Sequence, residues 1–205
     1  ETSIAQTVSV LVEWGLESLP VLDRDGRFAG LFGVEQALRA ALERRAAAGN
    51  VRDAEQPPAV SLIMQMLLPT VPASAPLHAA LAQLLVTQGR FLVVVSGWAP
   101  VGTLTDAQVA ARLPDALRPL WLAALRGQGQ LTQQAVESAA PGLTAADVAL
   151  TPAPLVRTRE TQDDAIRLAL EGGHERLVAV DDEGRLAGLV TRRGLLRALA
   201  QASGS

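Results

Sequence analysis

The amino-acid sequence predicts an α/β (α+β) fold made of three β-α-β-β-α repeats, with small, mostly antiparallel sheets packed in pairs. Two observations lead to this prediction: a long segment recurs without a gap, and each copy alternates helical and strand-like apolar patterns in the same order. The composition agrees, because 49% hydrophobic against 19% charged residues can form a buried core. With only 3% aromatic residues, that core must be mainly Ala, Leu and Val.

The repeat is plainest between residues 15–42 and 173–200. Aligned without a gap, 12 of these 28 positions are identical, which indicates an internal duplication. Residues 89–113 form a third, more diverged copy. The helical patterns that precede these stretches agree as well, so the repeated unit includes a helix before its strands.

Local signals predict each element of the first copy in order. Thr2-Ser3 suits a helix N-cap, and Gly15 suits a left-handed C-terminal cap, as do Gly89 and Gly173 in the other copies. We expect the first strand at residues 19–22, followed by an Asp-Gly turn at 23–26. The second strand is expected at 28–32 and the closing helix at 38–42.

The other two copies follow the same plan with one addition. Their strand pairs are expected at 91–95 with 101–104, and at 177–180 with 186–190. Each also begins with a short strand, at Thr70–Val71 and Leu155–Val156, which the first copy lacks. We predict repeat 1, without its first strand, at residues 1–48 and repeat 2 at residues 60–113. A helical linker is predicted at residues 114–144 and repeat 3 at residues 145–202.

Two connections separate the copies. Residues 44–59 are expected to be a short exposed connection. Residues 114–144 are expected to hold two short helices, around 116–125 and 131–138. Trp14 is expected in the core, and Asp163-Asp164 are expected to be solvated acids in the first turn of a helix.

The composition excludes several classes of function. The chain has no Cys, no Lys and only two His residues, which removes thiolate or lysine catalysis and a His-rich or Cys-ligated metal site. We therefore predict no enzyme and no metal. The formal charge of −3 gives no support for nucleic acid as a partner. No apolar run is long enough for a membrane span, so we do not expect direct membrane insertion. We expect a cytoplasmic location.

The repeats resemble the CBS domain, a small module that occurs in tandem pairs called Bateman modules. The residues that carry the resemblance are Asp147-Val148 before Thr151-Pro152, Leu19-Pro20-Val21, the Asp…Gly turn, and the closing Gly-apolar-apolar-Thr at Gly102–Thr105 and Gly188–Thr191. The resemblance implies that repeats pair sheet against sheet. Three copies leave one without a partner, so a fourth copy or a second chain is expected, most simply as a homodimer through CBS-repeat packing.

In the family, the cleft between paired repeats binds an adenosine compound, such as AMP, ADP, ATP or S-adenosylmethionine, as a regulatory ligand. The resemblance assigns phosphate contact to a Thr, which corresponds to Gly33, Thr105 and Thr191. It assigns the ribose to an Asp three residues later, where this chain has Gln36, Gln108 and Gly194. The ribose carboxylate is thus absent from all three copies.

The residues favour the third copy as the ligand site. Thr191 with Arg192 and Arg193 at a helix start could bind phosphate, whereas Asp106 beside Thr105 opposes an anion. The predicted ligand-binding residues are therefore Thr191, Arg192 and Arg193, an apolar wall of Leu155, Val156, Leu177 and Val178, and more weakly Thr105.

Two functions remain open at this point. The first is a regulatory module that senses an adenosine nucleotide or similar anion in an inter-repeat cleft and controls an attached or associated effector domain. The second is a ligand-free structural or dimerisation module with degenerate nucleotide sites.

Overall fold

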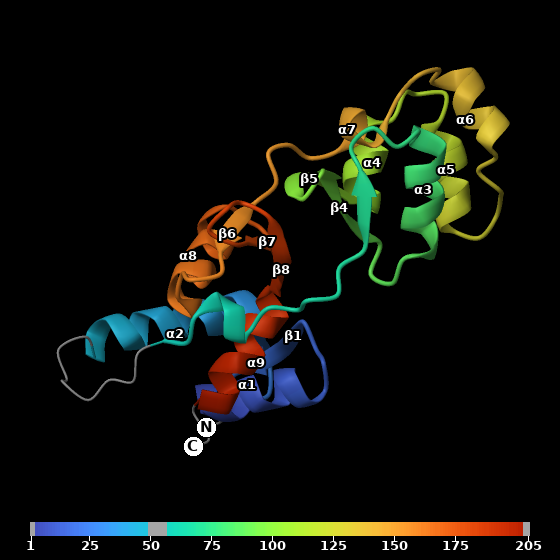
Figure 1. Cartoon of the computed structure of the whole chain (residues 1–205). Helices are drawn as coiled ribbons and strands as arrows, with labels where there is room; N and C mark the ends of the chain where they lie inside the picture. Colours follow the sequence, from blue (N-terminus) through green and yellow to red (C-terminus); the bar gives the residue numbers. More distant parts are fainter. Residues whose placement is uncertain (1–2, 49–56, 203–205) are drawn as a thin grey trace. The chain divides into compact units, whose positions relative to one another are not determined.

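The computed structural model describes residues 3–48 and 57–202, and in this part of the chain it shows a mixed α/β fold with three small sheets (Figure 1). By its internal contacts the chain divides into two compact units. Residues 1–65, 155–182 and 188–205 belong to the first unit, and residues 66–154 and 183–187 belong to the second. The first unit therefore joins repeats 1 and 3, which lie at opposite ends of the sequence.

Repeats 1 and 3 form the same elements at matching positions. Repeat 1 contributes α1 (Ile4–Glu13), β1 (Ser18–Leu22), β2 (Phe28–Gly33) and α2 (Val34–Ala48). Repeat 3 contributes β6 (Leu155–Arg157), α8 (Gln162–Glu171), β7 (Arg176–Val180), β8 (Leu186–Thr191) and α9 (Arg192–Ala202). In the ungapped alignment of the two copies, the bounds of α1, β1 and β2 coincide with those of α8, β7 and β8.

Helix caps explain where these elements begin and end. Ser3 caps α1 and Thr161 caps α8, each within a capping box. Gly15, Gly89 and Gly173 have φ angles of 63°, 74° and 64°, which confirms the left-handed conformation expected after the helices. Thr2, the other expected cap residue, lies outside the described residues.

The two sheets of the first unit differ by one strand. β1 and β2 form an antiparallel hairpin in which Leu19 faces Phe32 and Pro20 faces Leu31. In repeat 3 the strand order is β6-β7-β8, and β6 pairs parallel with β7. Among the described residues, β1 has no partner equivalent to β6.

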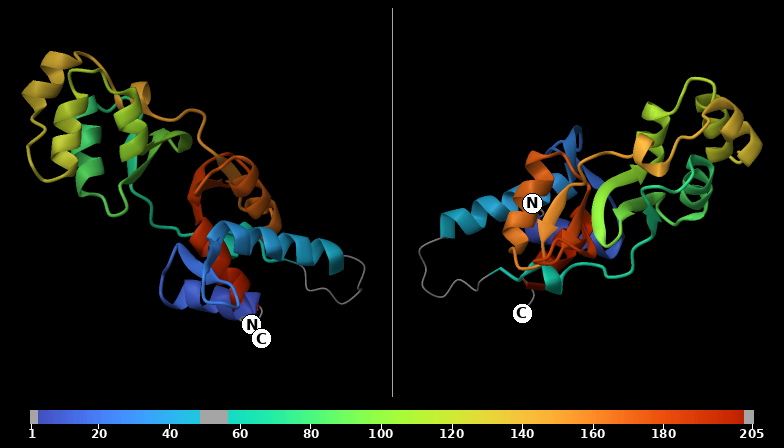
Figure 2. Two further views of the ribbon diagram at one scale, coloured as in Figure 1. Left: turned by 180° about the vertical axis from the view of Figure 1, so that it is seen from behind. Right: turned by 45° about the horizontal axis from the view of Figure 1, so that its top comes forward.

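Within the first unit, repeats 1 and 3 pack through helices. α1 packs on α9, α8 packs on α2, and α2 and α9 pack on each other (Figures 1 and 2). Exchanging the two repeats converts the α1–α9 contact into the α8–α2 contact, so the arrangement is pseudo-twofold. Leu38 and Leu196, at equivalent positions of α2 and α9, are completely or almost completely buried there. The sequence predicted pairing through sheet faces, whereas this pair uses the apolar stripes of its helices.

The second unit is built around repeat 2. Its sheet has the order β3-β4-β5, with β3 parallel and β5 antiparallel to the central strand. Trp121 is fully buried in its core, and its indole N–H donates to the carbonyl of Asp106 at 3.3 Å. Its elements are β3 (Thr70–Pro72), α3 (Leu77–Val86), β4 (Phe91–Ser96), β5 (Ala99–Thr105), α4 (Asp106–Arg112), α5 (Arg118–Leu125), α6 (Gln133–Ala139) and α7 (Ala145–Val148).

The segments that lead into repeats 2 and 3 are exchanged between the units. Residues 59–65, with the short 3₁₀ helix η1 (Val60–Leu62), precede the first strand of repeat 2 but belong to the first unit, where Gln65 and Leu189 exchange backbone hydrogen bonds of 2.8 and 2.9 Å. Residues 144–150 precede the first strand of repeat 3 but belong to the second unit, where Leu150 and Thr103 exchange bonds of 2.8 and 3.0 Å. The compact units thus do not follow the sequence boundaries 60–113 and 145–202.

Two local expectations were wrong. Residues 44–48, expected in a connection, continue α2, because Arg and Ala have high helix propensity. Trp14, expected in the core, is 73% exposed, because it follows the last turn of α1 beyond the apolar stripe. Residues 49–56 of the same connection lie outside the described residues. The two linker helices expected within 114–144 are present as α5 and α6.

Candidate functional site

Thr191 lies where β8 ends and α9 begins. Its hydroxyl oxygen accepts the backbone N–H of Gly194 at 2.9 Å, so it satisfies one of the free N–H groups at the helix start. The side chain is partly exposed, and its hydroxyl hydrogen can still be donated. Gly194, at the ribose position, has no side chain that could accept a sugar hydroxyl.

Arg192 is held by three acceptors. Its Nε donates to the carbonyl of His174 at 2.9 Å and its Nη2 to the carbonyl of Ala169 at 2.8 Å, at the end of α8. Its Nη1 forms an ion pair with Glu35 of repeat 1 at 3.3 Å. This guanidinium, only 17% exposed, connects the end of α8 to the start of α2.

Arg193 is paired with Glu17 of repeat 1, and this pair is more exposed than the Arg192–Glu35 pair. The structure therefore brings Thr191, Arg192 and Arg193 to one junction, as the sequence suggested, but it gives both arginines carboxylate partners. No sequence signal indicates these partners, because Glu17 and Glu35 are more than 150 positions away from the arginines that they contact. Phosphate binding by these three residues stays a prediction.

The predicted apolar wall is divided between the two faces of the sheet. Val156 and Leu177 are buried in the core that the helices cover. Leu155 and Val178 are paired across β6 and β7 and alternate with those core residues, which places them on the opposite face. Of the four, Leu155 alone is exposed, at 43%. Leu155 is thus the one residue of the four that is accessible on the sheet, because Val178 is fully buried and Val156 and Leu177 lie in the core.

Repeat 2 has the second junction of this kind. Thr105 caps α4 by accepting the N–H of Gln108 at 3.2 Å, and Asp106 follows in the first turn. The side-chain Oε1 of Gln108 is buried and has no hydrogen-bond partner in the described part of the chain. A buried acceptor without a donor is rare in proteins, so this atom is suited to an added hydroxyl group.

Repeat 1 has no equivalent side chain. Gly33 stands at the threonine position, and a Cβ there would lie 2.7 Å from the carbonyl oxygen of Glu17. Its N–H instead donates to Oε1 of Gln36 at 3.0 Å. Close packing against the backbone therefore prevents a threonine at this junction.

The adjacent acids of α8 have different environments. Asp164 accepts from the hydroxyl of Thr161 at 2.6 Å, and this bond lowers the pKa of its carboxyl against the opposing effect of partial burial. Asp163 is buried and forms an ion pair with Arg45 of α2, so the expectation of two solvated acids was wrong for Asp163. Its partner lies in repeat 1, far away in the sequence.

The residues that the structure describes contain neither a candidate metal-binding cluster nor a candidate membrane-spanning helix. In the described part of the chain, no three His, Cys, Asp or Glu side chains gather in a way that could hold a metal ion. No helix within residues 3–48 and 57–202 has the length and apolar character needed to cross a membrane.

Comparisons with known proteins agree with this architecture. The family model of the CBS domain matches residues 145–201. The CBS domain-containing protein CBSX1, chloroplastic, of Arabidopsis thaliana is 43% identical over 53 residues, which are 25% of this chain and 22% of that protein. The chain thus spans about a fifth of the length of that curated relative.

Solved structures extend the likeness to most of the chain. Protein MJ1225 from Methanocaldococcus jannaschii has a TM-score of 0.65 at 13% identity, over 97% of this chain and 64% of that one. CBSX2 of Arabidopsis thaliana, solved in complex with AMP, has a TM-score of 0.52 at 28% identity, over 71% of this chain and 98% of that one. The architecture is therefore that of proteins built from paired CBS repeats. Residues 145–201 match the CBS domain, and the fold of the chain is similar to that of CBS-pair proteins.

Proposed function

We propose that the chain is a regulatory CBS module without catalytic activity of its own, which binds an adenosine nucleotide or similar anion in the cytoplasm and controls an attached or associated effector. AMP, ADP, ATP and S-adenosylmethionine are the ligands to consider first. The similarity to CBSX2, which was solved with AMP, supports this class of ligand.

The observation that carries the proposal is the contact of Arg193 with Glu17 beside Thr191. A phosphate that accepts from the Thr191 hydroxyl competes with the Glu17 carboxylate for the same guanidinium. Because Glu17 belongs to repeat 1, this exchange removes an ion pair between repeats 1 and 3. An exposed pair of this kind contributes at most about 1 kcal/mol, so a bound phosphate can replace it. Ligand binding and repeat packing are thereby coupled.

Sugar recognition is supported in repeat 2. The buried, unpartnered Oε1 of Gln108 occupies the position that the family resemblance gives to the ribose carboxylate. An amide oxygen can accept one hydroxyl hydrogen bond. We assign this atom to a hydroxyl of a ligand bound within the second unit, and the Thr191 junction separately to an anion bound within the first unit.

Titration calorimetry and thermal unfolding of the full chain with AMP, ATP and inorganic phosphate test these assignments. A ligand at 100 times its Kd should stabilise the folded chain by about 2.7 kcal/mol. Glu17→Gln should raise affinity for all three by releasing Arg193. Thr191→Val should lower it severalfold, and Thr191→Ser, which keeps the hydroxyl, should not.

Gln108→Leu tests the hydroxyl contact proposed within the second unit. It should weaken AMP and leave inorganic phosphate unchanged. Absence of binding by every adenosine ligand and by phosphate would contradict the regulatory function. Binding that is unaffected by Glu17→Gln and Thr191→Val would place the site elsewhere.

A second candidate function is a structural module that dimerises, and the β1–β2 hairpin favours it. Leu31 is 63% exposed, whereas Leu189, its equivalent in repeat 3, is 6% exposed. Leu22 and Phe28 of the same hairpin are also exposed. Apolar side chains gathered on one hairpin are typical of an interaction surface. We propose that this hairpin is the contact of a homodimer, which either function can use.

A further inference from the structure

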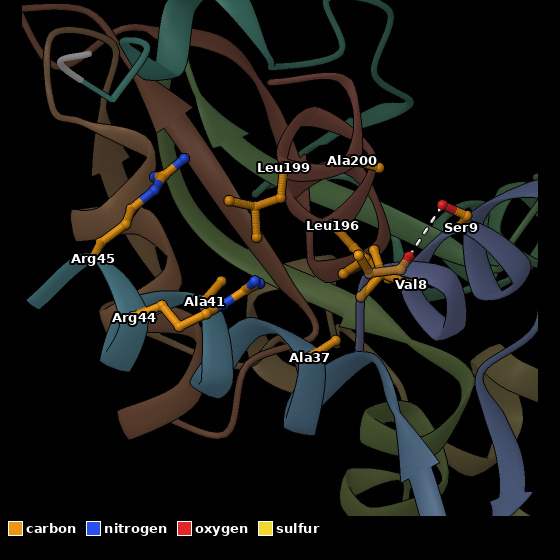
Figure 3. A pocket seen from close by; sticks show the side chains of 10 residues that line it. Val8, Ser9, Ala37, Ala41, Arg44, Arg45, Leu196, Leu199 and Ala200 are labelled. Atoms are coloured by element: carbon orange, nitrogen blue, oxygen red, sulfur yellow. Dashed lines mark hydrogen bonds between the residues drawn. The ribbon is translucent and has the colours of Figure 1, made fainter. Parts of the chain in front are cut away.

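A cavity of about 420 Å³ lies among α1, α2 and α9 of the first unit (Figure 3). It is separate from the Thr191 and Thr105 junctions and is the size of a small-molecule site. Three helices line it through Ala5, Val8, Ser9, Ala37, Ala41, Arg44, Arg45, Leu196, Leu199 and Ala200.

Apolar side chains form most of the cavity wall. Val8, Leu196 and Leu199 are buried, as are Ala37 and Ala41. The hollow exists because the small side chains of Ala37 and Ala41 leave space that larger side chains would fill. An apolar wall of this kind is suited to an aliphatic chain.

The pseudo-twofold arrangement supplies an internal comparison. Leu195 and Leu199 of α9 are the equivalents of Ala37 and Ala41 of α2. At the corresponding junction of α8, α9 and α2, Leu195 and Ile166 are fully or almost fully buried in the core. The chain therefore fills this site on one side of the pseudo-twofold axis and leaves it hollow on the other.

Positive charge lies at one end of the cavity. Figure 3 shows Arg44 and Arg45 of α2 on one side of the cavity, with the Arg44 side chain reaching toward Ala41, and Val8 and Ser9 of α1 on the opposite side. Arg45 is paired with Asp163, whereas Arg44 has no acidic partner among residues 3–48 and 57–202. Two guanidinium groups and one carboxylate leave a net charge of one, which matches a monovalent anion.

We propose that this cavity binds an aliphatic monocarboxylate. The carboxylate contacts Arg44, and the alkyl chain extends along Val8, Leu196 and Leu199. The cavity is lined by α1 and α2 of repeat 1 and by α9 of repeat 3, so an occupant stabilises the packing of these two repeats. This site does not depend on the nucleotide function.

Titration of the full chain with hexanoate, octanoate and 1-octanol tests the proposal. Each added methylene should raise affinity roughly fourfold, which corresponds to about 0.8 kcal/mol. Octanoate should bind roughly threefold to tenfold more tightly than 1-octanol, because only octanoate has the charged group for Arg44. Equal affinity for the two, or no binding of octanoate, would overturn the proposal.

Variants locate the site. Ala37→Leu copies the residue of the filled junction and should abolish octanoate binding; Ala5→Leu, on another helix, should also weaken it. Arg44→Gln should reduce octanoate binding and leave 1-octanol unchanged. Arg197→Gln is the matched control, because Arg197 is an exposed arginine of α9 that does not line the cavity. Octanoate binding that survives both alanine substitutions would show that the ligand lies elsewhere.

Discussion

Gly102 and Gly188 occupy equivalent positions of repeats 2 and 3, and each lies directly against a lead-in segment. A Cβ at Gly188 would lie 2.9 Å from the carbonyl oxygen of Gln65, and one at Gly102 would lie 2.9 Å from that of Leu150. The equivalent Gly30 of repeat 1 has nothing within 4 Å. The glycine of the repeated Gly-apolar-apolar motif is therefore required where a lead-in segment covers the sheet edge.

Substitution by alanine should lower stability at Gly102 and Gly188, which a neighbouring segment covers, but not at Gly30, which is open. We expect Gly102→Ala and Gly188→Ala to lower the free energy of unfolding by about 1–3 kcal/mol, because a backbone carbonyl must move. Gly30→Ala should leave it unchanged or raise it by up to about 1 kcal/mol. Urea unfolding at low protein concentration measures all three. Equal losses at the three sites would contradict the explanation.

The contribution of Asp164 to the stability of the fold depends on pH. Its hydrogen bond from Thr161 lowers the folded-state pKa below the ordinary value of 3.8. A group with a depressed folded pKa stabilises the fold fully above its unfolded pKa, and this contribution is lost as pH falls through the folded pKa. The contribution should therefore be fully present at neutral pH, begin to fall near pH 4, and continue to fall as pH approaches the lower folded-state pKa.

Urea unfolding of the wild type and Asp164→Asn between pH 7 and pH 3 tests this dependence. At pH 7 the variant should be less stable by roughly 0.5–1 kcal/mol, and the difference should shrink toward zero in acid. Glu183→Gln, an exposed acid in the turn before β8, serves as control and should show no such trend. A constant difference for Asp164→Asn across this range would refute the assignment.

The residue types at the Thr191 junction were predictable, and their partners were not. The motif and the repeat alignment place Thr191 and two arginines at a helix start, as the structure has them. The ion pairs of Arg192 and Arg193 join residues that are more than 150 positions apart. No local pattern specifies such contacts, because they depend on which repeats pack together. The same reason explains Asp163, whose partner Arg45 lies in another repeat.

At the scale of elements, the sequence predicted most helices and strands because their signals are local. Capping boxes at Ser3 and Thr161 and left-handed glycines after the helices act within a few residues. The exchange of the lead-in segments was not predictable in this way. It depends on the backbone bonds of Gln65 with Leu189 and of Leu150 with Thr103, which join residues that are far apart in the sequence. Apolar composition alone does not select one sheet edge over another.

At the scale of the whole chain, the pairing of repeat 1 with repeat 3 connects features that are separate in the sequence. Equivalent helices meet across a pseudo-twofold axis, and the ion pairs of Glu17, Glu35 and Arg45 cross between the repeats. An anion that releases Arg193 and a carboxylate that fills the cavity between α1 and α9 would act on this same packing in opposite directions. The repeat pair is thus the element through which either ligand could regulate an effector.

The exposed β1–β2 hairpin leads to a prediction about assembly. We expect the chain to form a dimer of about twice 21.5 kDa in light scattering, because a second copy can cover Leu31, Leu22 and Phe28. Leu31→Glu should shift the mass to that of the monomer, since a charge cannot be buried unpaired in such a contact. Leu67→Glu is the matched control, because Leu67 is 95% exposed and lies outside the hairpin. A wild-type chain that stays monomeric at high concentration, or a dimer that Leu31→Glu leaves intact, would exclude the hairpin as the dimer contact.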